Sequence, residues 1–158
     1  MILYHGSNVV VSKPLILEPS RLLDFGNGFY TTTNKSQAEN FALKVASRRG
    51  GKAIVNVYEL DENFADIKML GFDSPNEKWL DFVSDHRNGI YDGEEYDLIY
   101  GPVANDDVYR TLQTYLVGLL TKQQALETLK VKKLYDQYVF VTNDSLKLLK
   151  FLDYAEVK

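Results

Sequence analysis

Three short segments of this 158-residue chain place glycine or small polar residues beside strand-like aromatic runs, and ordinary globular sequence separates them. The segments are Leu3-Tyr4-His5-Gly6-Ser7, Asp24-Phe25-Gly26-Asn27-Gly28-Phe29-Tyr30-Thr31-Thr32 and Tyr135-Asp136-Gln137-Tyr138-Val139-Phe140. Their apolar and aromatic residues have the composition of β-strands. Glycine beside a strand lets a ligand approach the main chain closely. The three segments are therefore candidate strands at a binding site.

Composition limits the classes of protein to which the chain can belong. Its length and 45% hydrophobic content predict one domain over residues 1–158. The absence of cysteine excludes disulfides, thiolate metal sites and cysteine nucleophiles, and two histidines without metal-ligand spacing predict no metal site. A net charge of −4 disfavours broad, charge-driven binding of nucleic acid. With no signal peptide or membrane-spanning run, we expect a cytoplasmic protein without a membrane partner.

The hydrophobic pattern predicts a mixed α+β domain without the regular alternation of a doubly wound sheet. Residues 8–23 are expected to form a loop with at most one brief strand. Strands are expected at residues 2–5, 53–60, 97–100, 137–142 and 151–155, with β-type sequence also at 29–31. Helices are expected from residue 36 to the Gly50-Gly51 pair, after residue 74, and at 107–117, 122–129 and 145–149.

Two helix starts carry capping patterns. Ser36 is followed three residues later by Glu39, as in a capping box. Ser74 is followed three residues later by Glu77, with Pro75 at the expected first helical position. We expect the two serines to cap these helices.

In their order along the chain, the three segments resemble the motifs of ADP-ribosyltransferases of the diphtheria-toxin and poly(ADP-ribose) polymerase type. The resemblance implies an ADP-ribosyltransferase-like domain with two packed β-sheets around an NAD cleft and flanking helices. It also implies that NAD is a substrate, that nicotinamide is released, and that ADP-ribose passes to a macromolecular acceptor, either protein or nucleic acid.

The first segment supplies part of the implied NAD site. The resemblance implies that His5 bonds the adenosine ribose and that the main chain of Gly6 holds the nicotinamide amide, with Ser7 in the same binding segment. A planar carboxamide has one acceptor and two donors, which a main-chain amide and carbonyl can match. The alternative is a histidine at a strand end followed by a turn glycine.

The second segment supplies the implied walls of the nicotinamide pocket. Gly28, in the irregular Gly26-Asn27-Gly28 turn, precedes Tyr30, and Phe41 follows eleven residues after Tyr30. In the family, two aromatic residues at that spacing enclose the nicotinamide ring, and stacking needs only an aromatic face. The alternative for Phe41 is the core face of its helix.

The third segment departs from the family pattern. Gln137 lies where the transferases have a glutamate whose carboxylate stabilises the developing cation-like sugar. Glutamine can still accept a hydrogen bond from a ribose hydroxyl but carries no charge. Three functions stay open: a transferase that uses Gln137 together with His5 and Tyr30, a catalytically weak or inactive module that binds NAD or ADP-ribose, and an NAD glycohydrolase.

Another carboxylate could replace the missing glutamate. Asp136 is adjacent, but on a strand its side chain points to the face opposite that of Gln137. The other candidates in the sequence are Glu94, Glu95, Asp97, Asp106 and Asp107. The sequence does not choose among them.

More closely, the chain is similar to a bacterial family known only as domain of unknown function 3990. The similarity includes Tyr96-Asp97, the run Gly101-Pro102-Val103-Ala104, and Trp79 with Phe82 and Arg87. Gln137 fits the pattern of that family. The similarity implies a toxin with a small antitoxin protein as a partner.

Overall fold

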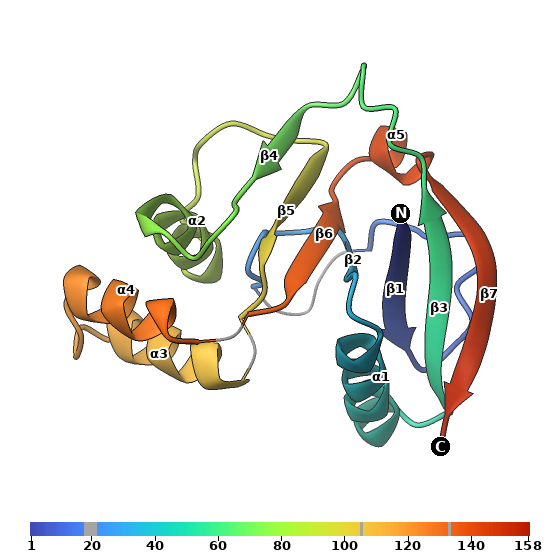
Figure 1. The fold of residues 1–158 in the computed structure, drawn as a ribbon, viewed down its shortest axis with the longest axis horizontal. Helices are drawn as coiled ribbons and strands as arrows, with labels where there is room; N and C mark the ends of the chain where they lie inside the picture. Colours follow the sequence, from blue (N-terminus) through green and yellow to red (C-terminus); the bar gives the residue numbers. More distant parts are fainter. Residues whose placement is uncertain (18–21, 105, 133) are drawn as a thin grey trace.

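The computed structural model of the protein describes residues 1–17, 22–104, 106–132 and 134–158. In these residues the chain forms seven strands and five helices (Figure 1). The strands are β1 (Ile2–Ser7), β2 (Phe29–Thr31), β3 (Ala53–Leu60), β4 (Met69–Gly71), β5 (Leu98–Pro102), β6 (Asp136–Phe140) and β7 (Leu149–Val157). The helices are α1 (Lys35–Arg49), α2 (Glu77–Arg87), α3 (Asp106–Leu116), α4 (Lys122–Lys130) and α5 (Asn143–Leu146).

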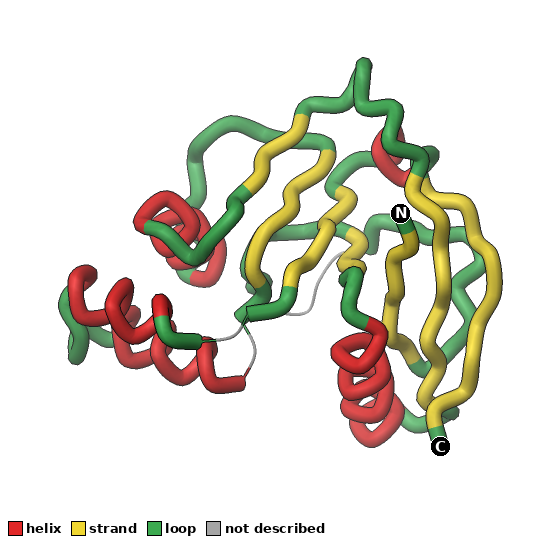
Figure 2. Tube along the Cα trace, viewed as in Figure 1, coloured by secondary structure: helices red, strands yellow, loops and turns green. Residues whose placement is uncertain are grey.

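The strands form two sheets. One has the order β1-β3-β7 and is antiparallel, and the other has the order β2-β6-β5-β4, in which only the β4–β5 pair is parallel. Figure 2 shows the first sheet on the right and the second in the centre. The sheets meet where Tyr4 of β1 exchanges two main-chain hydrogen bonds, of 2.8 and 2.9 Å, with Thr32 directly after β2. This contact brings the first two sequence segments side by side.

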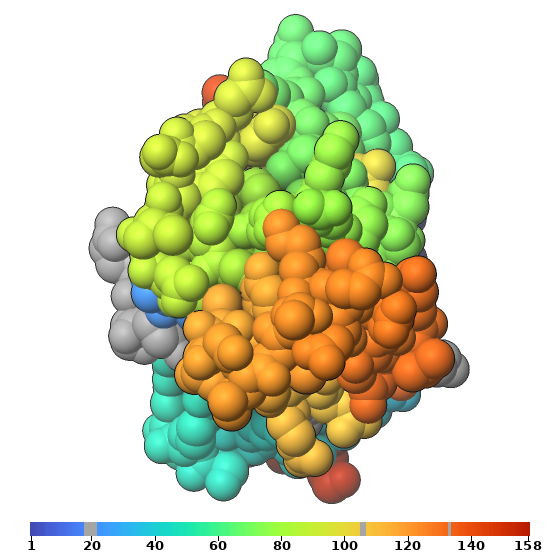
Figure 3. Space-filling model, turned by 90° about the vertical axis from the view of Figure 1, so that its left-hand side faces the viewer, coloured from blue at the N-terminus to red at the C-terminus, as the bar shows by residue number. Residues whose placement is uncertain are grey.

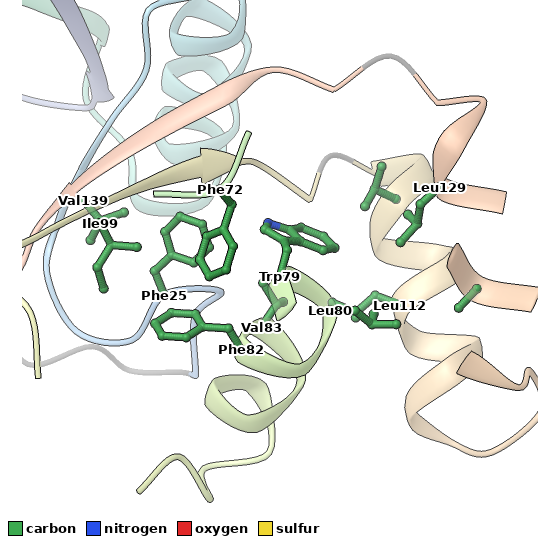
Figure 4. Packing of buried hydrophobic residues seen from close by; sticks show 12 residues of the cluster. Phe25, Phe72, Trp79, Leu80, Phe82, Val83, Ile99, Leu112, Leu129 and Val139 are labelled. Carbon is green, nitrogen blue, oxygen red and sulfur yellow. The ribbon is translucent and has the colours of Figure 1, made fainter. Parts of the chain in front are cut away.

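Two hydrophobic clusters hold the second sheet in place. One lies against α2, α3 and α4 and includes the rings of Phe25, Phe72 and Phe82 beside the fully buried Trp79 (Figure 4). The other includes Leu3 from the first sheet and Phe140 from the second, so it joins the two sheets. Figure 3 shows α3 and α4, in orange, and the yellow-green segment around α2 covering one face of the molecule.

Helix α1 packs on the first sheet at Gly6. A Cβ atom at Gly6 would lie 2.2 Å from the carbonyl oxygen of Ala38 and 2.8 Å from the main-chain nitrogen of Ala42. Both alanines are buried and form a third cluster with Val55. Only glycine therefore permits this approach of α1 to β1.

The structure confirms one α+β domain with two sheets and flanking helices, and the bounds of β3 agree with the prediction. Both helix caps were predicted wrongly. The amide nitrogens of the first turns are bonded by Asn34 and Asn76, not by Ser36 and Ser74. The short strand β4 was missed, because three residues give no readable alternation. In the ranges that the structure describes, no helix is both long enough and apolar enough to cross a bilayer.

We predict that Gly6→Ala destabilises the fold. The added methyl group meets main-chain atoms of α1, which cannot move without displacing the helix, so we expect a loss of about 1–3 kcal/mol in the free energy of unfolding. Urea denaturation measures this loss. Ser7→Ala, one residue along the same strand, is the control and should cost less, and equal stability of Gly6→Ala and wild type would contradict the packing described here.

Candidate functional site

His5 lies at the junction of the two sheets. Its Nδ1 atom is 2.7 Å from the carbonyl oxygen of Tyr30, and its ring packs at 4.2 Å from the ring of Phe29. A carbonyl only accepts, so Nδ1 carries the proton and Nε2 is the acceptor of the neutral ring. Burial lowers the pKa of His5, although the bond to Tyr30 opposes this shift. A neutral imidazole therefore presents Nε2 as an acceptor.

Gly6 is on the edge strand β1 and is buried against α1. Tyr4 directs its N–H and C=O to Thr32 and away from β3. Alternate residues of a strand direct these groups to the same side, so those of Gly6 also point away from β3. Strand β1 is the edge of its sheet, and β2 has already diverged from it at this point. The N–H and C=O of Gly6 are thus placed to bind a planar amide.

Phe41 is on α1, the helix that packs on β1 at Gly6. It precedes Ala42, whose nitrogen touches the Gly6 position, and its side chain is 42% exposed. The buried face of α1 consists of Ala38, Ala42 and Val45. Assignment of Phe41 to the core face of α1 is therefore wrong, and its ring is free to contact a ligand.

Tyr30 is held by the turn that precedes it. Its hydroxyl donates to the carbonyl oxygen of Gly26 at 2.7 Å and accepts from the amide of Phe25 at 3.0 Å. Burial and the nearby charge of Asp24 raise the pKa of Tyr30, so the phenol stays protonated. The side chain of Tyr30 therefore offers an aromatic surface and no base.

Gly28 and Ser7 have local structural roles. A Cβ at Gly28 would lie 2.6 Å from Val139 and 2.8 Å from the carbonyl oxygen of Phe140, so glycine is needed for close packing on β6. The hydroxyl of Ser7 accepts a bond of 3.4 Å from the amide of Val9. Both residues lie in the expected segments, and neither side-chain position points to a ligand.

Gln137 is buried, with 3% of its surface exposed. Its Nε2 atom lies 3.3 Å from the carbonyl oxygen of Pro102 and 3.5 Å from Oδ2 of Asp24. Strand β6 pairs with β2 so that Tyr30 faces Val139, and residues two apart on a strand share a face. Gln137 and Tyr30 therefore lie on the same face of the second sheet.

The structure adds two residues to the site, Asp24 and Arg87. The guanidinium of Arg87 donates to Oδ1 of Asp24 through Nε at 2.7 Å and through a terminal nitrogen, while Ala104 N–H donates to Oδ2 at 3.2 Å. The guanidinium also lies 4.8 Å from the ring centroid of Tyr109. Asp24 is 4% exposed. The position of Asp24 in a glycine-rich motif was the sequence signal for this acid, but no nearby residue indicated that Arg87 is its partner.

The carboxylates considered as replacements for a glutamate have other partners or other positions. Asp136 accepts from the hydroxyl and amide of Thr33, and it lies on the opposite face from Gln137 as predicted. Asp97 accepts from the amide of Lys68 and the hydroxyl of Thr142. Glu94 is at the surface. Glu95 and Asp107 are exposed, and the side chain of Asp106 lies outside the described residues.

Two cavities lie away from His5, Gly6, Tyr30 and Phe41. One of about 740 Å³ is lined by residues from the start of α2, from α4 and from the ends of β5 and β6, including the stacked pair Tyr100 and Tyr138. The other, of about 330 Å³, is lined by residues that include Asn27, His86 and Tyr91. Within the described ranges, no group of three His, Asp or Glu side chains could hold a metal ion.

We predict a pH-dependent contribution of His5 to stability. Its pKa in the folded protein is below the unfolded value of 6.5, so between these values the unfolded chain binds more protons and stability rises with pH. The contribution is complete above about pH 6.5 and is lost as pH falls towards the folded pKa. His5→Asn retains a donor for Tyr30 but does not titrate.

The stability difference between wild type and His5→Asn should therefore be largest near neutral pH and shrink in acid, as measured by urea denaturation. His86, whose pKa burial also lowers, is present in both proteins, so its titration cancels in the difference. A difference that does not change with pH would contradict the buried, neutral state of His5.

Comparison with protein families gives one match, over residues 1–151, to a family described as protein of unknown function DUF3990. No curated protein and no solved structure matches the chain. The matched range includes all three sequence segments and the Asp24–Arg87 pair. The chain therefore belongs to the DUF3990 family.

Proposed function

We propose that the protein is an NAD-dependent ADP-ribosyltransferase. The bond between the nicotinamide nitrogen and ribose C1′ breaks, and its electron pair stays with nicotinamide. A nucleophile of a macromolecular acceptor then bonds C1′ and releases its proton. The observation that carries the proposal is the convergence of three distant segments: His5 bonds the main chain of Tyr30, and Tyr30 shares a sheet face with Gln137.

The protonation state of His5 supports a role in binding ribose. Its Nδ1 is occupied by Tyr30, and Nε2 has no hydrogen-bond partner among the described residues. A neutral Nε2 accepts from a hydroxyl, which is the group that ribose offers. Lowering of the pKa by burial keeps His5 in this state near neutral pH.

Gly6 and Phe41 support binding of nicotinamide. The N–H and C=O of Gly6, on the edge strand β1, point away from β3 and supply one donor and one acceptor, the two kinds of group that a carboxamide pairs with. Phe41 is an exposed aromatic residue on α1, and the next residue of the helix, Ala42, contacts Gly6. Stacking of an aromatic ligand on such a ring contributes about 0.5–1.5 kcal/mol beyond the area that is buried.

Gln137 favours a second candidate, a module that binds NAD without turning it over efficiently. The amide is neutral, and the charge of the nearest carboxylate, Asp24, is compensated by Arg87. Loss of one well-placed electrostatic group typically slows a reaction about 100- to 1,000-fold. If the protein is a transferase, it should therefore turn over NAD slowly. If it is a binding module, it should not turn over NAD.

The family resemblance extends the proposal to a toxin with a small antitoxin partner. The acceptor is then a protein or nucleic acid of the cell, and cytoplasmic action follows from that role. Labelled NAD supplied together with a cell lysate distinguishes transfer, in which the label stays on a macromolecule, from hydrolysis, in which it appears as free ADP-ribose.

We predict that the purified protein releases nicotinamide from NAD and that His5→Ala lowers kcat/KM by at least about tenfold, because one hydrogen bond to ribose is lost. Chromatography of the reaction mixture measures the release. Saturable NAD binding without release would select the binding module, and wild-type activity in His5→Ala would overturn the site.

Phe41→Ala should raise KM for NAD several-fold, whereas Phe41→Tyr should keep the wild-type value because the stacking face remains. Leu43→Ala is the matched control, since Leu43 is on the same helix and 45% exposed. Initial rates at varied NAD concentration give these values. An equal effect of Phe41→Ala and Leu43→Ala would remove Phe41 from the site.

A further inference from the structure

We infer that Asp24 is a positioning residue that fixes the side-chain amide of Gln137, so that its oxygen and not its nitrogen faces the ligand, and that this pairing requires glutamine where the transferases have glutamate. The role of the oxygen in binding ribose rests on the function proposed above. The orientation of the amide rests only on the contacts of Gln137.

The neighbours of Gln137 determine which atom of its amide is left without a protein partner. Pro102 C=O and Asp24 Oδ2 both lie on the Nε2 side, at 3.3 and 3.5 Å. Neither a carbonyl nor a carboxylate oxygen can donate a hydrogen bond, so both select the amide nitrogen. The amide nitrogen has two hydrogens, one for each of these acceptors. The acceptor Oε1 is therefore the atom left for a ligand.

The hydrogen bonds of Asp24 make this orientation firm. Its Oδ1 accepts hydrogen bonds from two nitrogens of Arg87. Its Oδ2 accepts hydrogen bonds from the main-chain amide of Ala104 and from Nε2 of Gln137. The carboxylate is buried, so it cannot replace a lost donor with water. Rotation of the Gln137 amide would put an oxygen against Oδ2, and both the Pro102 carbonyl and Oδ2 would lose the hydrogen bond from Nε2.

Charge explains why glutamate does not fit at this position. One cation, Arg87, balances one buried anion, Asp24. A glutamate at residue 137 would add a second anion at about the 3.5 Å that now separates Nε2 from Oδ2. Two carboxylates this close cannot both be ionised without a large penalty, so one takes up a proton. In this protein, then, glutamate at residue 137 is expected to impair the site.

The experiment is a double-mutant cycle of Gln137→Glu, Asp24→Asn and the combined variant. In Asp24→Asn, the asparagine side chain can turn its own amide nitrogen towards Nε2 of Gln137. Two donors cannot bond each other, so this contact favours rotation of the Gln137 amide. The combined variant exchanges the two groups: the asparagine at residue 24 can donate and the glutamate at residue 137 can accept. Gln113→Glu, the same substitution at an exposed position of α3, is the control for added charge.

Two readouts are followed between about pH 8 and pH 5.5. The first is kcat for nicotinamide release, and the second is the free energy of unfolding in urea. At pH 8 we expect each single variant to lose at least about tenfold in kcat. The combined variant should recover part of this loss, because the contact between residues 24 and 137 is restored while the Pro102 carbonyl still lacks its donor. Gln113→Glu should retain wild-type values.

The pH profile separates positioning from a general structural defect. In Gln137→Glu, acidification protonates one of the two carboxylates, and a protonated glutamate can again donate to Asp24. Its kcat and its stability, relative to wild type, should therefore rise as pH falls. The combined variant should show a smaller rise, because it has one carboxylate at this place and no second anion that repels it.

Additive effects of the two substitutions, or a Gln137→Glu profile that does not change with pH, would overturn the inference. If wild type itself releases no nicotinamide, the proposed function fails. The stability arm then still decides whether Asp24 and Gln137 are paired, because it requires no substrate.

Discussion

The buried pair of Asp24 and Arg87 is the interaction on which the rest of the molecule depends. Asp24 is in the turn before β2, Arg87 ends α2, and the same carboxylate receives donors from Ala104 after β5 and Gln137 on β6. Removal of one partner of a buried ion pair costs about 3–5 kcal/mol, because the other charge is left without compensation. One carboxylate thus connects the glycine-rich turn, the helical layer and two strands of the second sheet.

This arrangement gives the proposed NAD site its chemical character. The amide of Gln137, the phenol of Tyr30 and the imidazole of His5 are all uncharged near neutral pH, and Arg87 neutralises the acid that contacts Gln137, Asp24. The proposed site therefore consists of hydrogen-bond acceptors, an aromatic surface and the main-chain groups of Gly6. Such a site binds a dinucleotide through shape and hydrogen bonds, and it supplies less electrostatic stabilisation to a cation-like sugar than a glutamate would.

Much of the fold follows from local pattern, whereas the site depends on distant contacts. The β-branched run of residues 53–60 predicted β3 with its bounds, because the buried strand and its turn signals are all in the sequence. The helix caps were assigned wrongly because Asn34 and Asn76 compete with nearby serines for the same amides. The family resemblance indicated His5, Tyr30 and Gln137 as site residues, and this assignment stays a prediction. Nothing in the sequence indicated that Arg87, 63 residues away, neutralises Asp24.

The most direct test of the central claim, that NAD binds where β1, β2 and α1 meet, is an NMR titration of the protein with NAD. The account predicts that the amide signals of Gly6, Tyr30 and Phe41 shift in a saturable manner. Signals of Gln123 and Lys130, which line the larger cavity, should stay in place. Shifts confined to that cavity, or no saturable shift, would contradict the assignment of the NAD site.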